Sequence, residues 1–463
     1  MIRRWRHCLG DGVMEKRHRV VILGGGFAGI YAALELDREF ATRPDVQITL
    51  VNRENFLLFT PMLHEIAAGD LDITNIVNPI RKLLKHVSFI EGQVREIDLE
   101  GRRVVVGHGI DEHTHELKFD QLVLALGSVT QFFGLPGVEE NALTMKSLSD
   151  AVQLRNRLIA ILETADTECS AGERRALLSV AVAGAGFAGV ETLASINDFL
   201  RSSLRYYPNL SEADLQLRLI HPGDVILPEL RARLGKYAQR KLEERGIEVL
   251  AHARVVSYDG TLIELGDGSR IPAETLIWTA GTTPNRLVGK LPCQIERGRV
   301  KVTAEMAVPD WPGVWALGDC ALVPDLTTGK FCPPTAQHAL RQGKVVASNV
   351  IAYVDGGPFR KFKFKTIGQL AAIGHRAGVA SIFGVNISGF LAWWMWRTIY
   401  LSKLPRLEKK IRVALDWTLD LIFSKDLCQF LDVRREHRMT EEDQASEEAH
   451  MGAALRMAAS QSR

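Results

Sequence analysis

The chain has 463 residues, of which 46% are hydrophobic and 24% charged, the composition of an ordinary globular protein with room for two or three domains. Its formal net charge is +2 and its basic residues are spread along the chain, so we exclude nucleic-acid binding. The six cysteines are scattered and form no CxxC or CxxxxC pair, which excludes chemistry through a redox dithiol and argues against structural disulfides.

Residues 1–17 are expected to be an extension that precedes the fold. They are basic but contain no apolar stretch as long as a secretory signal needs, which predicts a cytoplasmic protein. Met14 lies just ahead of the first apolar run, so residues 1–13 are interpreted as an upstream start-site extension.

One glycine-rich motif occurs twice, as GGGFAG at residues 24–29 and as GAGFAG at residues 184–189. Each copy follows a short apolar run that is typical of a buried strand, and a helical pattern begins after it, at Ile30 and Val190. In such a unit the first glycine makes the turn, the second lets the backbone approach a pyrophosphate, and the third packs the helix on the strand. One copy is weak evidence, because a glycine-rich turn can bind nothing, but two copies in context predict two bound dinucleotides.

The remaining elements repeat one order around these motifs. Residues 150–163 carry apolar side chains at helical spacing, and a domain boundary is expected near their start. The strands predicted after the fingerprints are residues 47–51 and 119–127 in the first unit, residues 216–220 and 275–281 in the second, and residues 314–320, which return to the first domain. The fold class is therefore α/β, with two Rossmann-like domains. Their predicted boundaries are residues 18–150 with 288–360, and residues 151–287.

Several short motifs share this order: GxGxxG, ALG, GxGxxGVE, WTAG, WALGDC and PPTAQxA, followed by a hydrophobic carboxyl-terminal segment. Over residues 18–432 this set resembles the type II (alternative) NADH:quinone oxidoreductases, which belong to the FAD-dependent pyridine nucleotide oxidoreductase superfamily. The PPTAQ motif and the carboxyl-terminal segment narrow the resemblance to this family. The resemblance implies a respiratory-chain enzyme that does not pump protons, passes a hydride from NAD(P)H to FAD, and passes two electrons on to a quinone.

The first fingerprint would bind FAD by this resemblance, with Asp319 holding the ribityl chain. A helix N-cap is the alternative role for Asp319. The second strand ends in Asn52, where the family normally has an acid that accepts both hydroxyls of the adenosine ribose, so this contact is expected to be weaker. The residues assigned to the FAD site are Gly24, Gly26, Phe27, Ala28, Gly29, Asn52, Arg53, Val94, Ala125, Gly127, Gly318, Asp319, Ala336 and Gln337.

The second fingerprint would bind the nicotinamide cofactor. In the family the carboxylate at Glu191 faces the nicotinamide; the alternative is a carboxylate favoured by the helix dipole in the first helical turn. The strand 217–220 ends in His221, where NAD-preferring members have an acid, so we hypothesise that discrimination against NADPH is relaxed. The residues assigned to this site are Gly184, Gly186, Gly189, Glu191, His221, Ala280 and Gly281.

For the acceptor, Ala336, Gln337 and Gly343 match the family's quinone-site helix, AQxxxQxG, whose second glutamine is Arg341 here. Gln337 is expected to hydrogen-bond a quinone carbonyl, and Arg341 either stabilises a reduced acceptor or excludes the usual quinone. The alternative is that both side chains face solvent one helical turn apart. With Glu191, these two residues are the predicted catalytic set.

Residues 361–435 are expected to associate with a membrane or a second subunit. The apolar run 390–404 is too short to span a bilayer. After it, apolar side chains share one helical face (Leu407, Ile411, Ala414, Leu415, Thr418, Leu421, Ile422) and polar ones the other (Glu408, Arg412, Asp416, Asp420). Aromatic residues, a basic edge and an amphipathic helix predict a peripheral anchor at the cytoplasmic face of the inner membrane. The alternatives are packing on the protein's own core and a homodimer interface, and residues 436–463 are predicted to be a poorly ordered tail.

A cluster of possible metal ligands is interpreted as a solvated hairpin loop, because no ligand spacing is enforced there: His108, Asp111, Glu112, His113, His115 and Glu116. No metal site is predicted. Three other functions stay open. A sulfide:quinone oxidoreductase would need cysteines at the flavin, where only Cys332 is a candidate; a soluble reductase of a protein acceptor would lack the membrane helix; and a redox sensor would bind both dinucleotides without turnover.

Overall fold

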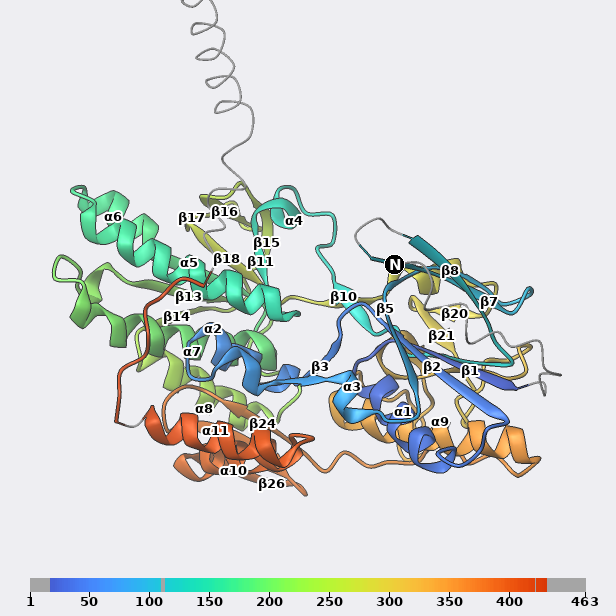
Figure 1. Ribbon diagram of the computed structural model, residues 1–463. Coiled ribbons are helices and arrows are strands. Elements are labelled where there is room, and N and C mark those ends of the chain that lie inside the picture. The colour runs from blue at the N-terminus through green and yellow to red at the C-terminus, as the bar shows by residue number, and fades with distance from the viewer. Residues whose placement is uncertain (1–16, 110–112, 421, 431–463) are drawn as a thin grey trace, which may run out of the picture.

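The computed structural model describes residues 17–109, 113–420 and 422–430, so the predicted tail and most of the amino-terminal extension lie outside the described residues. Two α/β lobes stand side by side, each built on a parallel sheet (Figure 1). The strand order is β22-β9-β1-β2-β5 in the first lobe and β11-β18-β12-β13-β14 in the second. The order β9-β1-β2-β5 therefore recurs as β18-β12-β13-β14, as the duplicated fingerprint predicts.

The strands of the first sheet are apolar and buried. Ile22 lies opposite Leu50 on one neighbouring strand and Val123 on the other, and all three are fully buried. Helices α1 (Phe27–Glu39) and α9 (Ala336–Asp355) pack closely together beside it. The strands are β1 (His18–Leu23), β2 (Val46–Asn52), β5 (Ser88–Glu91), β9 (Gln121–Leu124) and β22 (Val314–Ala316). β22 pairs in parallel with β9, so the chain returns to this sheet after the second unit.

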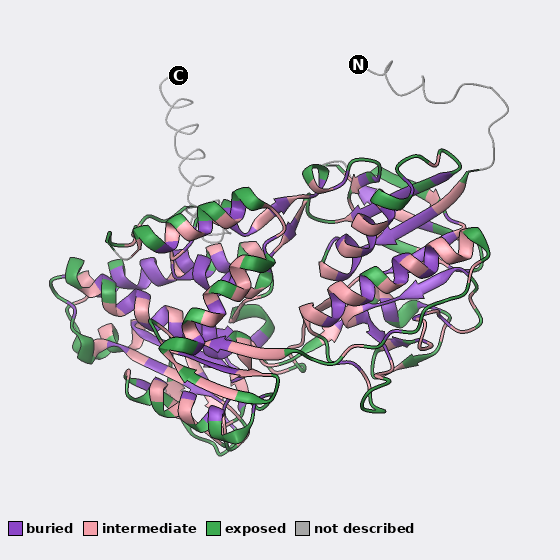
Figure 2. Cartoon of the chain, turned by 90° about the horizontal axis from the view of Figure 1, so that it is seen from below, coloured by how far each residue is buried: buried purple, intermediate pink, exposed green. Residues whose placement is uncertain are grey.

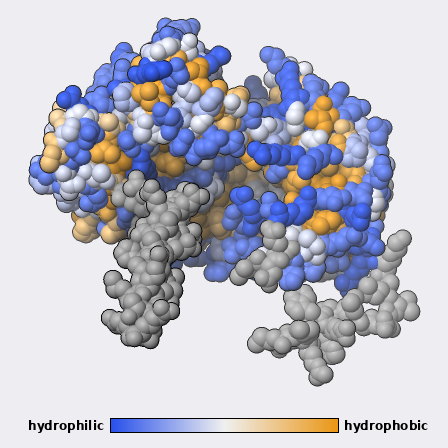
Figure 3. Space-filling view, turned by 90° about the horizontal axis from the view of Figure 1, so that it is seen from above, coloured by the Kyte–Doolittle hydropathy of each residue, from blue (hydrophilic) through white to orange (hydrophobic). Residues whose placement is uncertain are grey.

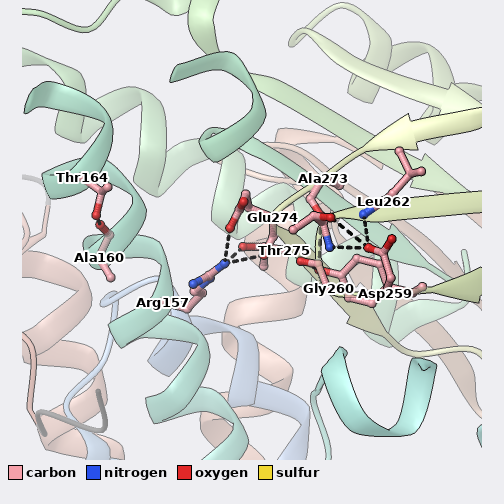
Figure 4. A network of polar contacts seen from close by, with 11 residues as sticks. Arg157, Ala160, Thr164, Asp259, Gly260, Leu262, Ala273, Glu274 and Thr275 are labelled. Atoms are coloured by element: carbon pink, nitrogen blue, oxygen red, sulfur yellow. Dashed lines mark hydrogen bonds and ion pairs between the residues drawn. The ribbon is translucent and has the colours of Figure 1, made fainter. Parts of the chain in front are cut away.

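The second sheet has the same construction. Its strands are β11 (Leu143–Thr144), β12 (Ser179–Ala183), β13 (Gln216–Ile220), β14 (Ile247–Leu250) and β18 (Thr275–Trp278). Its helices are α5 (Leu148–Thr167), α6 (Ala171–Leu177), α7 (Phe187–Ser203) and α8 (Ala232–Glu243). Arg157 ties α5 to the start of β18, because its guanidinium donates to Thr275 Oγ1 at 3.2 Å and pairs with the Glu274 carboxylate at 3.1 Å (Figure 4).

Each lobe also carries a three-stranded antiparallel sheet. These are β6 (Gln93–Asp98), β7 (Arg103–His108) and β8 (His113–Lys118) in the first lobe, and β15 (Val255–Tyr258), β16 (Leu262–Leu265) and β17 (Arg270–Pro272) in the second. β7 and β8 form the predicted hairpin, although residues 110–112 of its loop lie outside the described residues. Across the described ranges, no group of three His, Cys, Asp or Glu side chains is placed to hold a metal ion.

The lobes are joined at several places. β10 (Ser128–Thr130) pairs antiparallel with β19 (Thr282–Pro284), which links the ends of the two nucleotide-binding units. A second connection is α2 (Leu63–Ala67), which follows β2 in sequence but packs on α5 and α7, so that Leu63 and Ile66 belong to the second lobe's core. Both lobes have continuous buried interiors (Figure 2). The remaining short elements are β3 (Phe56–Leu58), β4 (Val77–Pro79), α3 (Ile80–Leu83), α4 (Val138–Asn141), β20 (Ile295–Glu296), β21 (Arg299–Lys301) and β23 (Ala321–Leu322).

The carboxyl-terminal region begins with a sheet that the sequence pattern did not predict. β24 (Gly368–Ala372), β25 (Gly378–Ile382) and β26 (Val385–Gly389) are antiparallel, and they contact α10 (Phe390–Lys403) as well as α7 and α8. α11 (Leu407–Leu419) follows, and α10 and α11 lie below the second lobe in Figure 1. Within the described part of the chain, no helix is long and apolar enough to cross a membrane.

Candidate active site

The first fingerprint has the geometry that a dinucleotide-binding turn requires. Gly24 has φ +110°, and a Cβ built on it would lie 2.2 Å from the carbonyl oxygen of Ala125. A Cβ on Gly29 would lie 1.9 Å from the Gly24 carbonyl oxygen, so the third glycine allows α1 to approach the turn. Above Gly26 nothing lies within 4 Å, which leaves room for a pyrophosphate at the amino terminus of α1.

The second fingerprint repeats this arrangement at the amino terminus of α7. Gly184 has φ +107°, and a Cβ on it would lie 2.8 Å from the backbone nitrogen of Ala280. A Cβ on Gly189 would lie 1.9 Å from the Gly184 carbonyl oxygen. Gly186 is open except for the carboxylate of Glu229, 3.2 Å from the position of its Cβ. The residues of both turns therefore fit dinucleotides.

Asn52 acts within the first turn. Its Oδ1 accepts a hydrogen bond from the Gly25 backbone N–H at 2.7 Å, and its Nδ2 donates to the carbonyl oxygen of Glu54 at 2.7 Å. The amide thus stabilises the glycine-rich loop. Of the other residues assigned to this site, Arg53 pairs with the Glu54 carboxylate at the surface, and Val94 packs against the first core.

Asp319 does not cap a helix. The short 3₁₀ turn Gly318–Cys320 is preceded by Leu317, and Asp319 Oδ2 accepts a hydrogen bond from Ser128 Oγ at 2.7 Å. Lys146 Nζ donates to the same hydroxyl at 2.9 Å, so a polar chain from both lobes converges on this carboxylate. The alternative N-cap role is therefore wrong.

Sequence reasoning missed the supporting residues around Gly318. Gln342 Oε1 accepts a hydrogen bond from the Gly318 N–H at 2.8 Å, and Gly343 lets α9 approach α1, since a Cβ there would lie 2.4 Å from the Ala28 carbonyl oxygen. Gln342 directly precedes Gly343, the matched glycine of AQxxxQxG. This position next to the motif was the only feature of the sequence that pointed to Gln342. Ser128 and Lys146 had no such signal.

Glu191 corrects one expectation. α7 begins at Phe187, three residues before the predicted start, so Glu191 lies beyond the first helical turn and the dipole explanation does not apply. Its carboxyl is buried, and Oε1 accepts hydrogen bonds from Trp396 Nε1 at 2.8 Å and from the Ala372 N–H at 3.1 Å. Burial raises its pKa to about 8 despite these two donors. Glu191 is therefore protonated at neutral pH.

Aromatic side chains connect Glu191 to the first fingerprint. Phe27, the first residue of α1, lies 5.8 Å from Phe59 between ring centroids. Phe59 lies 6.2 Å from Tyr400, and Tyr400 lies 4.8 Å from Trp396, whose indole donates to Glu191. Phe27 packs against the cores of both lobes. One run of packed aromatic rings thus connects the first dinucleotide turn to Glu191 on α7.

Gln337 and Arg341 lie on one face of α9, as predicted, but neither simply faces solvent. Gln337 Nε2 donates to the Gly368 carbonyl oxygen at 3.3 Å, which leaves its second N–H free. Arg341 Nη1 donates to the Gln337 carbonyl oxygen at 2.7 Å, and its guanidinium lies 4.0 Å over the Phe364 ring. Both side chains are partly buried, so the solvent-facing alternative is wrong.

The five cysteines within the described ranges are free thiols. Cys320 is buried, its thiol donates to the carbonyl oxygens of Leu124 and Leu317, and burial raises its pKa to about 11. Burial likewise raises the pKa of Cys332 to about 11. Thiols with such pKa values are protonated at neutral pH and are poor nucleophiles, which disfavours sulfide chemistry.

Comparison with known proteins agrees with this geometry. The family model described as pyridine nucleotide-disulphide oxidoreductase matches residues 18–343, and the NDH2 C-terminal domain matches residues 367–426. A type II NADH:quinone oxidoreductase of Mycobacterium tuberculosis is 32% identical over 426 residues, 89% of this chain and 89% of that protein. This chain belongs to the type II NADH:quinone oxidoreductase family. It is an oxidoreductase.

Other members of this family and its fold relatives show how far the likeness extends. Demethylphylloquinone reductase of Synechocystis is 32% identical over 412 residues, 87% of this chain and 96% of that protein. The structure of NDH2 from Plasmodium falciparum in complex with NADH matches with a TM-score of 0.83 at 20% identity, over 89% of this chain and 100% of that one. Sulfide:quinone oxidoreductase of Aquifex aeolicus shares the fold with a TM-score of 0.65 at 18% identity, over 88% of this chain and 96% of that one.

Proposed function

We propose that this enzyme oxidises NADH through a flavin, FAD, held by the first fingerprint, and delivers two electrons to a quinone. The observation that carries the proposal is the run of aromatic rings from Phe27 to Trp396, because it joins the first dinucleotide turn to Glu191 behind the second. Two nucleotides bound at these turns would meet between the lobes. The names of the family members support NADH as donor and a quinone as acceptor.

The protein's part in this reaction is positioning. A bound flavin supplies the redox chemistry, accepting a hydride and releasing electrons. Asp319, held by Ser128, would accept hydrogen bonds from hydroxyl groups of the cofactor, and the open backbone above Gly26 would meet its pyrophosphate. Glu191 would present a neutral carboxyl beside the nicotinamide, fixed by Trp396.

Gln337 is the proposed contact to the acceptor. Its amide has a second N–H after the bond to Gly368, and an amide N–H is a suitable donor to a quinone carbonyl. Arg341 would act indirectly, because its guanidinium is held over Phe364 and against the backbone of Gln337.

Membrane association is proposed through the exposed apolar side chains of the carboxyl-terminal region. On α11, Leu407, Ile411, Leu415 and Leu419 recur every fourth residue and are 50–72% exposed. On α10, Phe390, Leu391 and Trp394 are also more than half exposed. The opposite face of the molecule, seen from above in Figure 3, mixes hydrophilic surface with hydrophobic patches on both lobes. This stripe of exposed apolar side chains on α10 and α11, with basic residues beside it, suits binding to the surface of a bilayer. We propose that the bilayer surface is the cytoplasmic face of the inner membrane.

The predicted homodimer would need a surface other than this stripe, since the stripe is assigned to lipid. The mass of the purified enzyme in detergent, measured by light scattering, tests this part of the proposal. A monomer mass contradicts it.

The main proposal is tested by anaerobic titration of the purified yellow protein with NADH and then with a soluble quinone. NADH should bleach the flavin absorbance and the quinone should restore it, and the cofactor released on denaturation should have the mass of FAD. Bleaching by sulfide but not by NADH would overturn the proposal.

A further inference from the structure

The tight turn between β25 and β26 holds an aromatic ring in solvent. Ile382 pairs with Val385, so the two central residues of the turn are Phe383 and Gly384, with φ of +49° and +84°. Asn or Asp followed by Gly is favoured in such a turn, and a bulky residue with positive φ is strained. Phe383 is nevertheless 82% exposed, and Val385 is 61% exposed. The ring therefore adds little to the stability of the fold, and a binding role can explain it.

α8 carries a strongly basic outer face. Five of the eleven residues 231–241 are Lys or Arg and none is acidic, and the first turn of the helix contains no acid. We call four exposed cations the basic face of α8: Arg231, Arg233, Lys236 and Arg240. The last three line one groove with Tyr237. Glu244 pairs with Lys241 at 2.5 Å and with Arg240 at 4.0 Å, whereas no carboxylate of the described residues pairs with the other three cations of the basic face.

The basic face of α8 lies beside this turn. Arg231 Nη2 is 3.9 Å from the position of a Cβ built on Gly384, in the turn itself. Tyr237 Oη is 3.4 Å from the position of a Cβ on Gly389, where β26 ends, and α10 begins at the next residue, Phe390. α8, β26 and α10 lie together at the lower end of the second lobe (Figure 1). The turn and the basic face are therefore continuous with the exposed apolar side chains of α10.

Anionic lipid suits this surface better than a second copy of the chain does. An interface around a two-fold axis brings the same patch of both copies together, so the cations of one basic face would meet those of the other. A bilayer that contains anionic phospholipid instead offers phosphates to the cations and an acyl boundary to the exposed apolar side chains.

We infer that the β25–β26 turn and the basic face of α8 form a second membrane contact, in which Phe383 and Val385 enter the acyl boundary and the cations bind the phosphates of anionic phospholipids. The inference rests on the proposed membrane association of α10 and α11. It adds to that association a helix of the second lobe, and a second contact restricts how the enzyme tilts on the bilayer.

The test compares flotation with vesicles of phosphatidylcholine alone and with vesicles that also contain phosphatidylglycerol. The wild type should bind the anionic vesicles more tightly, and this preference should shrink at high salt. Arg233→Gln with Lys236→Gln should weaken binding to anionic vesicles at least tenfold and change binding to neutral vesicles less than threefold, because each cation near an anionic surface contributes about fivefold in affinity. Arg286→Gln with Lys290→Gln is the matched control, since it removes the same two charges from exposed positions packed on the first lobe and should leave both affinities unchanged.

Phe383→Asn tests the turn. Asn suits a backbone with positive φ, so the melting temperature should stay the same or rise. Binding to both kinds of vesicle should fall about tenfold, because an aromatic ring no longer enters the acyl boundary.

Two outcomes would overturn the inference alone. One is an α8 double variant that binds anionic vesicles like the wild type. The other is a mass, measured by light scattering, that falls from dimer to monomer in this variant, which would assign the surface to a second copy of the chain. A wild type that floats with neither kind of vesicle contradicts both the inference and the proposed membrane association.

A different result would count against the proposed stripe and not against the second contact. In that result, Ile411→Asn with Leu415→Asn on α11 binds both kinds of vesicle like the wild type, while the α8 double variant loses the preference for anionic vesicles.

Discussion

Glu191 shows how a motif and a tertiary contact combine at one residue. The GVE motif marks it in the sequence, but its indole partner, Trp396, lies 205 positions along the chain. Because the carboxyl is enclosed between α7, β24 and α10, burial outweighs its two hydrogen-bond donors and its pKa rises. The residue is therefore a neutral group, whereas a carboxylate was expected.

Replacing Glu191 by Gln should change how stability depends on pH. With a folded pKa of about 8 and an ordinary value of 4.5, the unfolded chain loses this proton first as pH rises, so its contribution is complete below pH 4.5 and is lost as pH rises toward 8. The slope is about 1.4 kcal/mol per pH unit.

The melting temperature of the wild type should therefore fall relative to that of Glu191→Gln between pH 5 and pH 8, as measured by calorimetry. Glu65, whose pKa burial also raises to about 8, is unchanged in both proteins, so its effect cancels in the comparison. Parallel pH profiles would show that Glu191 is ionised in the folded enzyme.

Substitutions at Gln337 and at Arg341 should have different effects on quinone kinetics. Gln337→Leu removes the amide proposed to contact the acceptor, so kcat/KM for quinone should fall about tenfold while the rate of flavin reduction by NADH is unchanged. Arg341→Gln, the matched variant one helical turn away, should change quinone kcat/KM less than threefold because the guanidinium is held by Phe364. Stopped-flow and steady-state assays measure the two half-reactions, and equal losses in both variants contradict the assignment.

α11 shows that a helical pattern in the sequence does not decide which face of a helix packs against the rest of the protein. The predicted apolar face is exposed, yet the helix does pack on the protein's own core, as one alternative predicted, through other residues. The helix is held instead by Lys409, Val413 and Trp417, a third face that the pattern did not single out. Trp417 Nε1 donates to the buried Glu65 carboxyl at 3.2 Å. Asp416, expected on the solvent side, accepts a hydrogen bond from Asn75, and the predicted Leu421 lies outside the described residues.

Substitutions on the two faces of α11 should have opposite effects. Ile411→Asn with Leu415→Asn removes exposed apolar area, so binding to vesicles that contain anionic lipid should fall at least tenfold with little change in melting temperature. Val413→Ala opens a cavity in the core, so it should cost about 2 kcal/mol of unfolding free energy and leave vesicle binding intact. Vesicle flotation and thermal unfolding measure the two quantities; a double variant that binds vesicles like the wild type contradicts the anchor.

At the scale of the whole molecule, the carboxyl-terminal region belongs to the second lobe's core. Trp396, Leu404, Val413 and Trp417 are buried in the same cluster as residues of α2, α5 and α7. α2 comes from the first third of the chain, so this cluster draws on segments far apart in sequence.

A chain truncated after residue 388 should therefore lose stability as well as lipid contact. Removing these large buried side chains exposes the core around α7, so the truncated protein should aggregate or melt at least 10 °C lower than the full chain. Because the truncation also removes core residues, a loss of membrane binding in it does not identify the membrane anchor. The surface variants of α11 test the anchor directly. A truncated protein with a wild-type melting temperature would show that the region is a separate module.

The sequence by itself determined the duplicated α/β fold, the two dinucleotide turns and the family, because glycine spacing and apolar runs are local constraints that the backbone of each turn enforces. It also pointed to Glu191, Gln337 and Asp319. Only the tertiary structure decided what these residues touch: the protonation of Glu191 depends on burial by Trp396, and the exposed side of α11 depends on what Val413 packs against. Burial and charge proximity are set by segments distant in sequence, and no local pattern encodes them.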